Sequence, residues 1–112
     1  MKLLTEELKK QLPPLYSQEK VSDPMVICKF FHPMSSMTWY AIEGSPVDED
    51  GYYDTEKEKV DFFFFGWVHS DFSELGWFSL SEMEAINVGG LRMERDLHFT
   101  PKPLSTVKKE HQ

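Results

Sequence analysis

The sequence has little of several features that would place it quickly in a class of proteins. Its 112 residues include one cysteine, so no disulfide can form within the chain. No apolar run approaches the ~20 residues that a transmembrane helix needs, and acids near the N-terminus stand where a signal peptide would have its apolar stretch. We therefore expect a cytoplasmic protein without membrane association.

Basic residues are also scarce. The chain has 12 Lys and Arg against 19 Asp and Glu, which gives a formal net charge of −7. Affinity for a phosphate backbone comes from Lys and Arg that displace counterions, so we expect no direct binding to duplex nucleic acid. The same charge suits a protein partner with a basic surface, and it equally suits ordinary solubility.

Aromatic residues, by contrast, are plentiful. Nine Phe, four Tyr and three Trp, within a hydrophobic fraction of 40%, can form a core without disulfides or a structural metal. A chain of this length has room for one core, so residues 1–112 are predicted to form a single domain. Cys28 lies inside an apolar run and is interpreted as a packed small side chain.

Five segments have the pattern of β-strands. Residues 25–32 and 37–43 flank a short turn and predict a hairpin. Residues 60–68 are apolar on both alternate faces, which is typical of a central strand. Short strands are predicted at 75–78 and 96–100. The prediction is an α+β fold with a small antiparallel sheet of about four to five strands.

Two helices are indicated by their first turns. Thr5 can cap an N-terminal helix that has acids in its first turn, lysines in its last, and Pro13 beyond its end. In the C-terminal half, Ser79 and Glu82 form a capping box, which begins a short helix from Leu80 to about Asn87, with Gly89-Gly90 as its stop signal. Residues 101–112 are predicted to be a loosely ordered tail.

The loop from residue 44 to 58 is acidic. It is not a calcium loop, because placing Gly51 at position six puts Pro46 at position one and Lys57 at position twelve, where calcium requires carboxylates. We interpret the loop as a solvated turn or a surface for a basic partner. The candidate partner-binding residues are Asp48, Glu49, Asp50, Tyr52, Tyr53 and Asp54.

A second candidate site combines aromatic and charged residues. Alternation along a strand would point Trp39 and Glu43 to one face and Tyr40 to the other. Such a group can hold a nucleotide or another planar ligand, or the aromatics can be core and Arg95 can form a local ion pair. The candidate ligand-binding residues are Trp39, Tyr40, Glu43, Trp77 and Arg95.

The four histidines do not occur at metal-binding spacings. His69, Asp71 and Glu74 are conceivable as a site for metal-assisted hydrolysis, but no spacing requires it. There is also no Gly-rich phosphate loop. We therefore predict no cofactor, no metal and no catalytic residue.

Several longer motifs carry a family resemblance, and they span nearly the whole chain. They include Leu12-Pro13-Pro14-Leu15-Tyr16, and the most specific are residues 74–82 and Glu94-Arg95-Asp96. Through them the chain resembles a domain-of-unknown-function family of small bacterial proteins that occur largely on plasmids, phages and integrative elements. The resemblance implies no activity and no catalytic residues. It implies a setting in which small acidic proteins act on host proteins or on proteins of the element.

The leading hypothesis is a non-catalytic interaction protein, an inhibitor or adaptor, that binds a basic protein through the 44–58 loop and exposed aromatics. A small-ligand module is the alternative, and a metal-assisted hydrolase is the third. The chain is expected to be a monomer or a homodimer, and an edge strand at 25–32 would support the dimer.

Overall fold

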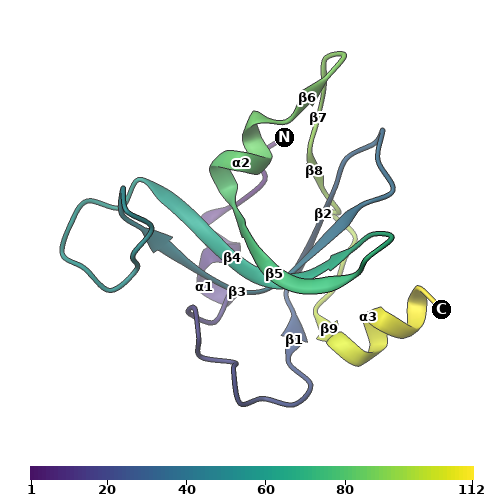
Figure 1. Cartoon of the computed structure of the whole chain (residues 1–112), viewed down its shortest axis with the longest axis horizontal. Coiled ribbons are helices and arrows are strands. Elements are labelled where there is room, and N and C mark those ends of the chain that lie inside the picture. Colours follow the sequence, from purple (N-terminus) through teal and green to yellow (C-terminus); the bar gives the residue numbers. More distant parts are fainter.

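The computed structural model describes residues 1–112 and confirms the predicted α+β class (Figure 1). Its main feature is a five-stranded antiparallel sheet with the strand order β5-β4-β3-β2-β8. The strands are β2 (Cys28–Phe31), β3 (Thr38–Val47), β4 (Asp61–His69), β5 (Glu74–Ser79) and β8 (Glu94–Arg95).

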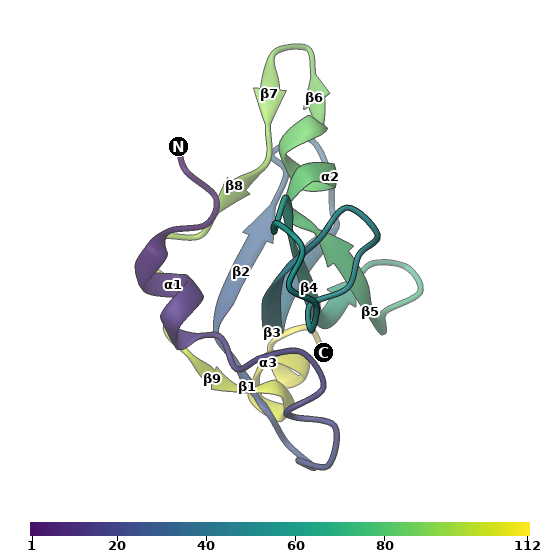
Figure 2. The same ribbon diagram turned by 90° about the vertical axis from the view of Figure 1, so that its left-hand side faces the viewer.

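Smaller elements surround this sheet. Two ladders of two strands pair β1 (Met25–Val26) with β9 (Lys102–Pro103) and β6 (Asn87–Val88) with β7 (Leu91–Arg92); the second ladder projects beyond the end of the sheet (Figure 2). The helices are α1 (Glu6–Gln11), α2 (Leu80–Ala85) and α3 (Leu104–Glu110). None of them has the length and apolarity needed to cross a membrane.

Both predicted helix starts are confirmed. The Thr5 side chain accepts a hydrogen bond from the Leu8 N–H at the start of α1. At the start of α2, the Ser79 hydroxyl accepts from the Glu82 N–H and donates to the Glu82 carboxylate at 2.8 Å. Phe78 on one side of this cap is buried in the same cluster as residues of α2. The local sequence is sufficient to place these two caps because each cap bonds a residue three positions away. Asp61 adds a distant contribution to α2, because its carboxylate accepts from the Ser81 N–H at 3.1 Å.

Two boundaries in the second half differ from the predictions. Helix α2 ends at Ala85, and Gly89-Gly90 instead forms the tip of the β6–β7 hairpin, with φ of +60° and +87° as a type I′ turn requires. The strand predicted at 96–100 is wrong, because β8 ends at Arg95. The Asp96 carboxylate accepts from the His98 N–H, and this local turn competes with further strand pairing.

Residues 101–112 form β9 and α3, in place of the loosely ordered tail that we expected. Leu104 and Val107 of α3 are buried against the sheet. Asp23 caps the helix from a distant segment, because its carboxylate accepts from the Ser105 N–H at 2.9 Å and from the Ser105 hydroxyl at 2.6 Å. A cap supplied from so far along the chain leaves no local signal in the sequence.

The strand order also corrects the predicted edge of the sheet. Residues 28–31, within the segment proposed as an edge, form β2, which pairs with both β3 and β8. Strand β3 is central and extends to Val47, into the region predicted to be loop. The edges are β8, which has two residues, and β5, which has six.

Alternate residues of the strands pack on two different clusters. We call one side the closed face; its cluster is Leu3, Leu4, Leu12, Cys28, Phe30, Ala41, Phe62, Phe64, Phe78, Met83 and Met93. The other side, the open face, has the cluster Val26, Tyr40, Ile42, Trp67, Leu104 and Val107. Cys28 is packed as predicted, and burial raises the pKa of its thiol to about 12.

Candidate functional site

A groove of about 330 Å³ opens on the open face. Side chains from the 16–24 segment, from β3, β4 and β5, and from α3 line it. We call it the aromatic groove; its principal lining residues are Tyr16, Val21, Ile42, Glu43, Phe65, Leu75, Trp77, Leu104 and Lys108. Its volume lies at the lower end of the range of small-molecule pockets, roughly 300–1,000 Å³.

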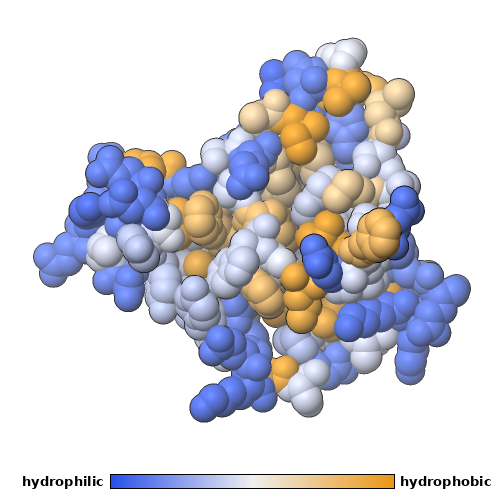
Figure 3. All heavy atoms as spheres, in the orientation of Figure 1, coloured by the Kyte–Doolittle hydropathy of each residue, from blue (hydrophilic) through white to orange (hydrophobic).

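The aromatic rings of this region contact one another in a row. Trp77 lies 4.8 Å from Phe65 and 5.4 Å from Tyr16, centroid to centroid, and Tyr16 lies 5.7 Å from Tyr53. Trp77 is nevertheless 50% exposed, Tyr16 48% and Leu75 49%. Hydrophobic residues reach the surface over β5, between the hydrophilic 48–60 loop and the hydrophilic end of α3 (Figure 3). The fold therefore leaves a contiguous aromatic and apolar surface uncovered.

A β-bulge places Glu43 on the groove side. The register between β3 and β4 shifts between Ala41 and Glu43, so that Tyr40 lies opposite Trp67 and Glu43 lies opposite Phe65. The prediction that Glu43 shares a face with Trp39 is wrong, because the bulge adds one residue and reverses the alternation. Trp39 packs against the closed-face cluster instead.

Glu43 lines the groove and fixes the chain segment on its other side by hydrogen bonds. Its side chain is buried, and its two carboxylate oxygens accept from the Tyr16 N–H at 2.9 Å and from the Gln18 N–H at 2.7 Å. The nearby Ser45 hydroxyl accepts from the Leu15 N–H at 3.0 Å. Tyr16 has a φ of +71°, in the left-handed region that is costly for a residue with a side chain. These bonds hold Tyr16 over Trp77 and engage both oxygens of Glu43.

The acidic loop contains one organising residue and several exposed ones. The Asp48 carboxylate is buried and accepts hydrogen bonds from the Thr55 hydroxyl and from the N–H groups of Asp50 and Tyr52. These bonds lower the pKa of Asp48, and the bond from Thr55 has the largest effect. Asp48 is therefore a structural residue of the loop. The remaining candidates of the loop are at the surface: Glu49, Asp50, Tyr52, Tyr53 and Asp54.

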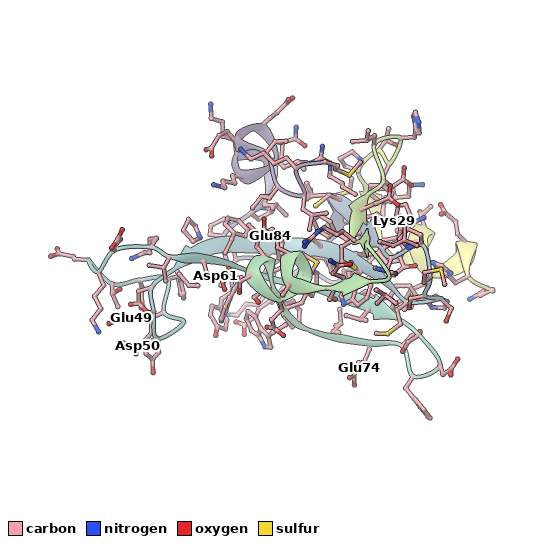
Figure 4. All side chains as sticks on the ribbon, turned by 90° about the horizontal axis from the view of Figure 1, so that it is seen from above. Lys29, Glu49, Asp50, Asp61, Glu74 and Glu84 are labelled. Carbon is pink, nitrogen blue, oxygen red and sulfur yellow. The ribbon has the colours of Figure 1, made fainter.

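Only part of this loop lies beside the groove. Tyr53 contacts Tyr16, which connects the loop to the row of rings. Glu49 and Asp50 lie on the loop beyond the end of the sheet, far from Glu74 (Figure 4). Asp50 forms an exposed ion pair with Lys57 at 2.8 Å. The loop can thus attract a partner at the groove by charge, while its acids do not line the groove.

The structure separates the residues that were predicted to bind a small ligand. The Arg95 guanidinium donates to the carbonyls of Lys2 and Leu3, both at 2.9 Å, and so fastens the N-terminus. Tyr40 is buried, and burial is the main cause that raises its pKa to about 12. Of the five candidates, Trp77 and Glu43 line the groove, and of these two Trp77 is half exposed whereas Glu43 is buried.

His69 lies in a cluster different from the predicted one. Its ring stacks on His111 at 3.8 Å, its Nδ1 is 2.9 Å from the Ser73 hydroxyl, and the Tyr40 hydroxyl lies 2.6 Å from His111 Nε2. Burial, and then the neighbouring His69, lower the pKa of His111. Asp71 is exposed and outside this cluster, and no group of three or more His, Cys, Asp or Glu side chains is placed to hold a metal ion.

Sequence reasoning missed several residues of the groove. Tyr16, Phe65, Leu75 and Lys108 were not among the candidates, although all four line it. The sequence did contain one signal of this surface: Leu75 and Trp77 are at i and i+2 of a predicted strand, so both side chains lie on the same face. Whether that face is covered depends on α3 and on the 16–24 segment, which are remote in the sequence.

Comparison with protein families identifies the group to which the chain is related. The family described as "Protein of unknown function (DUF2958)" matches residues 3–110, and the chain belongs to this family. No curated protein and no solved structure match the chain. The family description states no activity, so the function has to be argued from the groove.

Proposed function

We propose that this member of the DUF2958 family is a non-catalytic interaction protein, an inhibitor or adaptor, that binds a protein with a basic surface through the aromatic groove. The observation that carries the proposal is the exposure of Trp77 and Tyr16, 50% and 48%, in a row of mutually contacting rings. Tyr and Trp are enriched among the residues that dominate binding energy at protein interfaces.

The groove is held in place by rigid elements. Phe65 and Trp77 are on adjacent strands in register, and Glu43 fixes the opposite wall through two backbone hydrogen bonds. A surface that is ordered before binding loses little conformational entropy when a partner docks. This favours a docking surface over an uncovered part of the core.

Charge supports a basic partner. The chain carries a net charge of −7, and the 48–58 loop, which reaches the groove through Tyr53, carries exposed acids. Within the lining, Lys108 is the only basic residue. Such a field accelerates association with a basic surface and has less effect on the dissociation rate.

The proposal includes the location of the protein in the cell and the origin of its partner. We place the protein in the bacterial cytoplasm, where a free cysteine such as the buried Cys28 remains reduced. The partner is then a protein of the host or of a mobile element, which is the context that the family resemblance implies. Systematic inspection of neighbouring genes in members of the family tests this part, and a scatter over unrelated chromosomal loci would contradict it.

The decisive experiment compares two variants of similar exposure. Tagged wild-type protein, Trp77→Ala and Val88→Ala are used for quantitative affinity capture from the native host; Val88 is 52% exposed and lies on the distant β6–β7 hairpin. We expect one basic protein in stoichiometric amount with wild type and Val88→Ala, and its loss with Trp77→Ala. Equal recovery with all three proteins would refute the groove as the binding surface.

The contribution of the loop is measured separately. We expect a triple variant Glu49→Lys, Asp50→Lys and Asp54→Lys to slow association with the captured partner at low salt, because it reverses exposed charges near the groove. The double variant Glu6→Lys and Glu7→Lys, at exposed positions of α1, is the control. An association rate equal in the two variants would show that the loop serves solubility.

A small planar ligand is the second candidate, and the volume of the groove favours it. The exposed ring of Trp77 offers a stacking surface. Lys108 and Glu19 are charged groups of the lining that could face the ligand, whereas both oxygens of Glu43 are already engaged. A ligand at about a hundred times its Kd adds about 2.7 kcal/mol of stability, which a thermal-shift screen of nucleotides and other planar metabolites detects. No shift across the screen, or a shift retained in Trp77→Ala, would eliminate this candidate.

A further inference from the structure

Strand β5 forms one edge of the sheet, and its outer side has no neighbouring strand. It pairs only with β4, over six residues. In an antiparallel edge strand, alternate residues direct their N–H and C=O groups outward, where they are available to another chain. The opposite edge, β8, has two residues, and the Arg95 N–H there already contacts the Met1 sulfur at 3.1 Å.

The β5 edge lacks the features that usually protect an exposed edge. Proteins blunt such edges with Lys, Pro or a bulge. The sequence Glu-Leu-Gly-Trp-Phe-Ser contains neither Lys nor Pro, and its one charged residue is Glu74 at the first position. Its register with β4 runs without a shift from Phe63↔Ser79 to Val68↔Glu74. Leu75 and Trp77 expose half of their surface beside it. The edge is therefore regular, apolar and accessible.

Gly76 in the middle of β5 is a second, independent observation. Its φ is not in the left-handed region, and a Cβ built on it would meet no atom within 4 Å. Gly66, opposite it on β4, is required by the fold, because a Cβ there would lie 1.8 Å from the Tyr40 carbonyl oxygen. The fold does not require Gly76, and a glycine inside a strand often marks the close approach of another backbone.

We propose that β5 binds an extended segment of the partner as a sixth strand of the sheet. This inference rests on the proposed function and states how the partner binds. The backbone of the segment pairs with β5, and its alternate side chains extend over the groove beside Leu75 and Trp77.

Acidic residues beside β5 indicate which side chains the partner segment carries. The remaining side chains of the added strand face the other side of the sheet, where Glu74 points away from the body of the molecule (Figure 4). Helix α2, which packs on that side through Met83, adds the exposed acids Glu82 and Glu84. The segment that fits both sides alternates apolar residues with Lys or Arg.

A second copy of the chain fits the edge less well. Each copy carries a net charge of −7, so two copies that join along β5 repel each other. Glu74 of each copy would lie at the junction, and no basic residue of β5 would face it. The basic segment is therefore the occupant that we assign.

Random linear peptides, displayed on phage and long enough to cover β5, are the first probe, with the full chain as the target. We expect enriched peptides to have apolar residues at i and i+2 with Lys or Arg between them, and Trp77→Ala to weaken the best one by roughly thirtyfold. Enriched peptides with helical spacing that still require Trp77 would overturn strand addition and leave the groove function intact. The absence of enriched peptides would overturn strand addition, and affinity capture would still decide the groove function.

Backbone methylation then tests the hydrogen bonds themselves. The best peptide is synthesised with one N-methyl group at each position in turn, which removes an N–H and keeps every side chain. We expect losses of roughly tenfold at every second position and tolerance at the positions between, because only alternate N–H groups face β5. A flat response along the peptide would overturn the proposal.

The unbound protein provides the last measurement. Sedimentation at increasing concentration, together with amide hydrogen exchange of residues 74–79, reports whether the edge is already occupied. We expect a monomer whose outward β5 amides exchange rapidly and become protected when the peptide is added. A dimer with protected β5 amides before peptide addition would overturn the proposal in favour of a second copy.

Discussion

The closed and open faces of the sheet use similar residues for different purposes. On the closed face, Phe64 has no exposed surface, and rings of Phe30, Phe62 and Phe78 surround it at 5.4, 5.0 and 5.2 Å. On the open face, Trp77 is as much a part of the sheet but remains half exposed. The comparison teaches that aromatic content alone does not distinguish a core from a binding surface.

The difference comes from what covers each face. Leu3, Leu4 and Leu12, which flank α1, and Met83 of α2 complete the closed-face cluster. Helix α3 covers Tyr40 and Ile42 on the open face but does not extend over the outer strands, so the groove remains between α3, the 16–24 segment and β5. Substitutions on the two faces should therefore differ in their effect on stability and on binding.

Replacing neighbouring residues of β4 compares the two faces directly. Phe64→Ala removes a fully buried ring and is expected to lower the free energy of unfolding by about 3–5 kcal/mol. Phe65→Ala, on the open face, should cost clearly less, because Phe65 is only partly buried. Denaturant unfolding of both variants gives the two values, and equal losses would show that the faces are packed alike.

Removing the carboxylate of Glu43 should release the segment around Tyr16 and Gln18 from the sheet. Glu43→Ala leaves the N–H groups of Tyr16 and Gln18 without acceptors, and we expect a loss of about 2–3 kcal/mol in unfolding free energy. Glu43→Gln keeps one acceptor oxygen and should lose less. Amide exchange at residues 16 and 18 locates the effect, and unchanged protection there would contradict the structural role of Glu43.

Acid should loosen the end of α3. In the folded protein the pKa of His111 is lowered, chiefly by burial and then by the neighbouring His69. Lys29 lowers the pKa further, and Glu110 raises it. The unfolded chain therefore takes up the proton first as the pH falls. Stability is lost as the pH drops below about 6.5, the ordinary pKa of His, through the lower pKa of the folded state.

Fluorescence can follow this loss, because Trp67 lies 5.7 Å from the His111 ring. The variant His111→Gln should lose the pH dependence between neutral and mildly acidic conditions. The exposed His98, replaced in the same way, serves as the control. A wild-type signal that stays constant over this pH range would contradict the prediction.

The smallest effect on stability is expected at the most important residue of the proposed site. Trp77→Ala should change the unfolding free energy by less than about 1 kcal/mol, because the side chain is half exposed. The Trp77→Ala variant should nevertheless lose its binding to the captured partner. A large destabilisation would mean that Trp77 belongs to the core and that the open face is not a separate surface.

Local features of the fold could be predicted from the sequence. The cap at Thr5, the capping box at Ser79, the hairpin around residues 33–36 and the apolar strand at 60–68 all agree with the structure in position. Each of them depends on residues close together in the chain. The predicted site was less accurate, because it required knowing which strand faces would be covered.

The errors have a common physical cause. The bulge after Ala41 reversed the side of Glu43, Asp23 capped α3 from a remote segment, and Arg95 bound the carbonyls of the N-terminus. Each of these outcomes depends on a partner far away in the sequence. Periodicity and local capping rules do not contain that information.

By itself the sequence determined the class of the fold, the starts of α1 and α2, the aromatic sheet and the acidic charge. These follow from side-chain alternation, capping groups and composition, which act locally or simply add up. The tertiary structure alone decided that β5 is an edge and that Trp77 and Tyr16 remain exposed together. A side chain on a strand is covered or uncovered by elements distant in the chain, and only the packing of those elements settles its exposure.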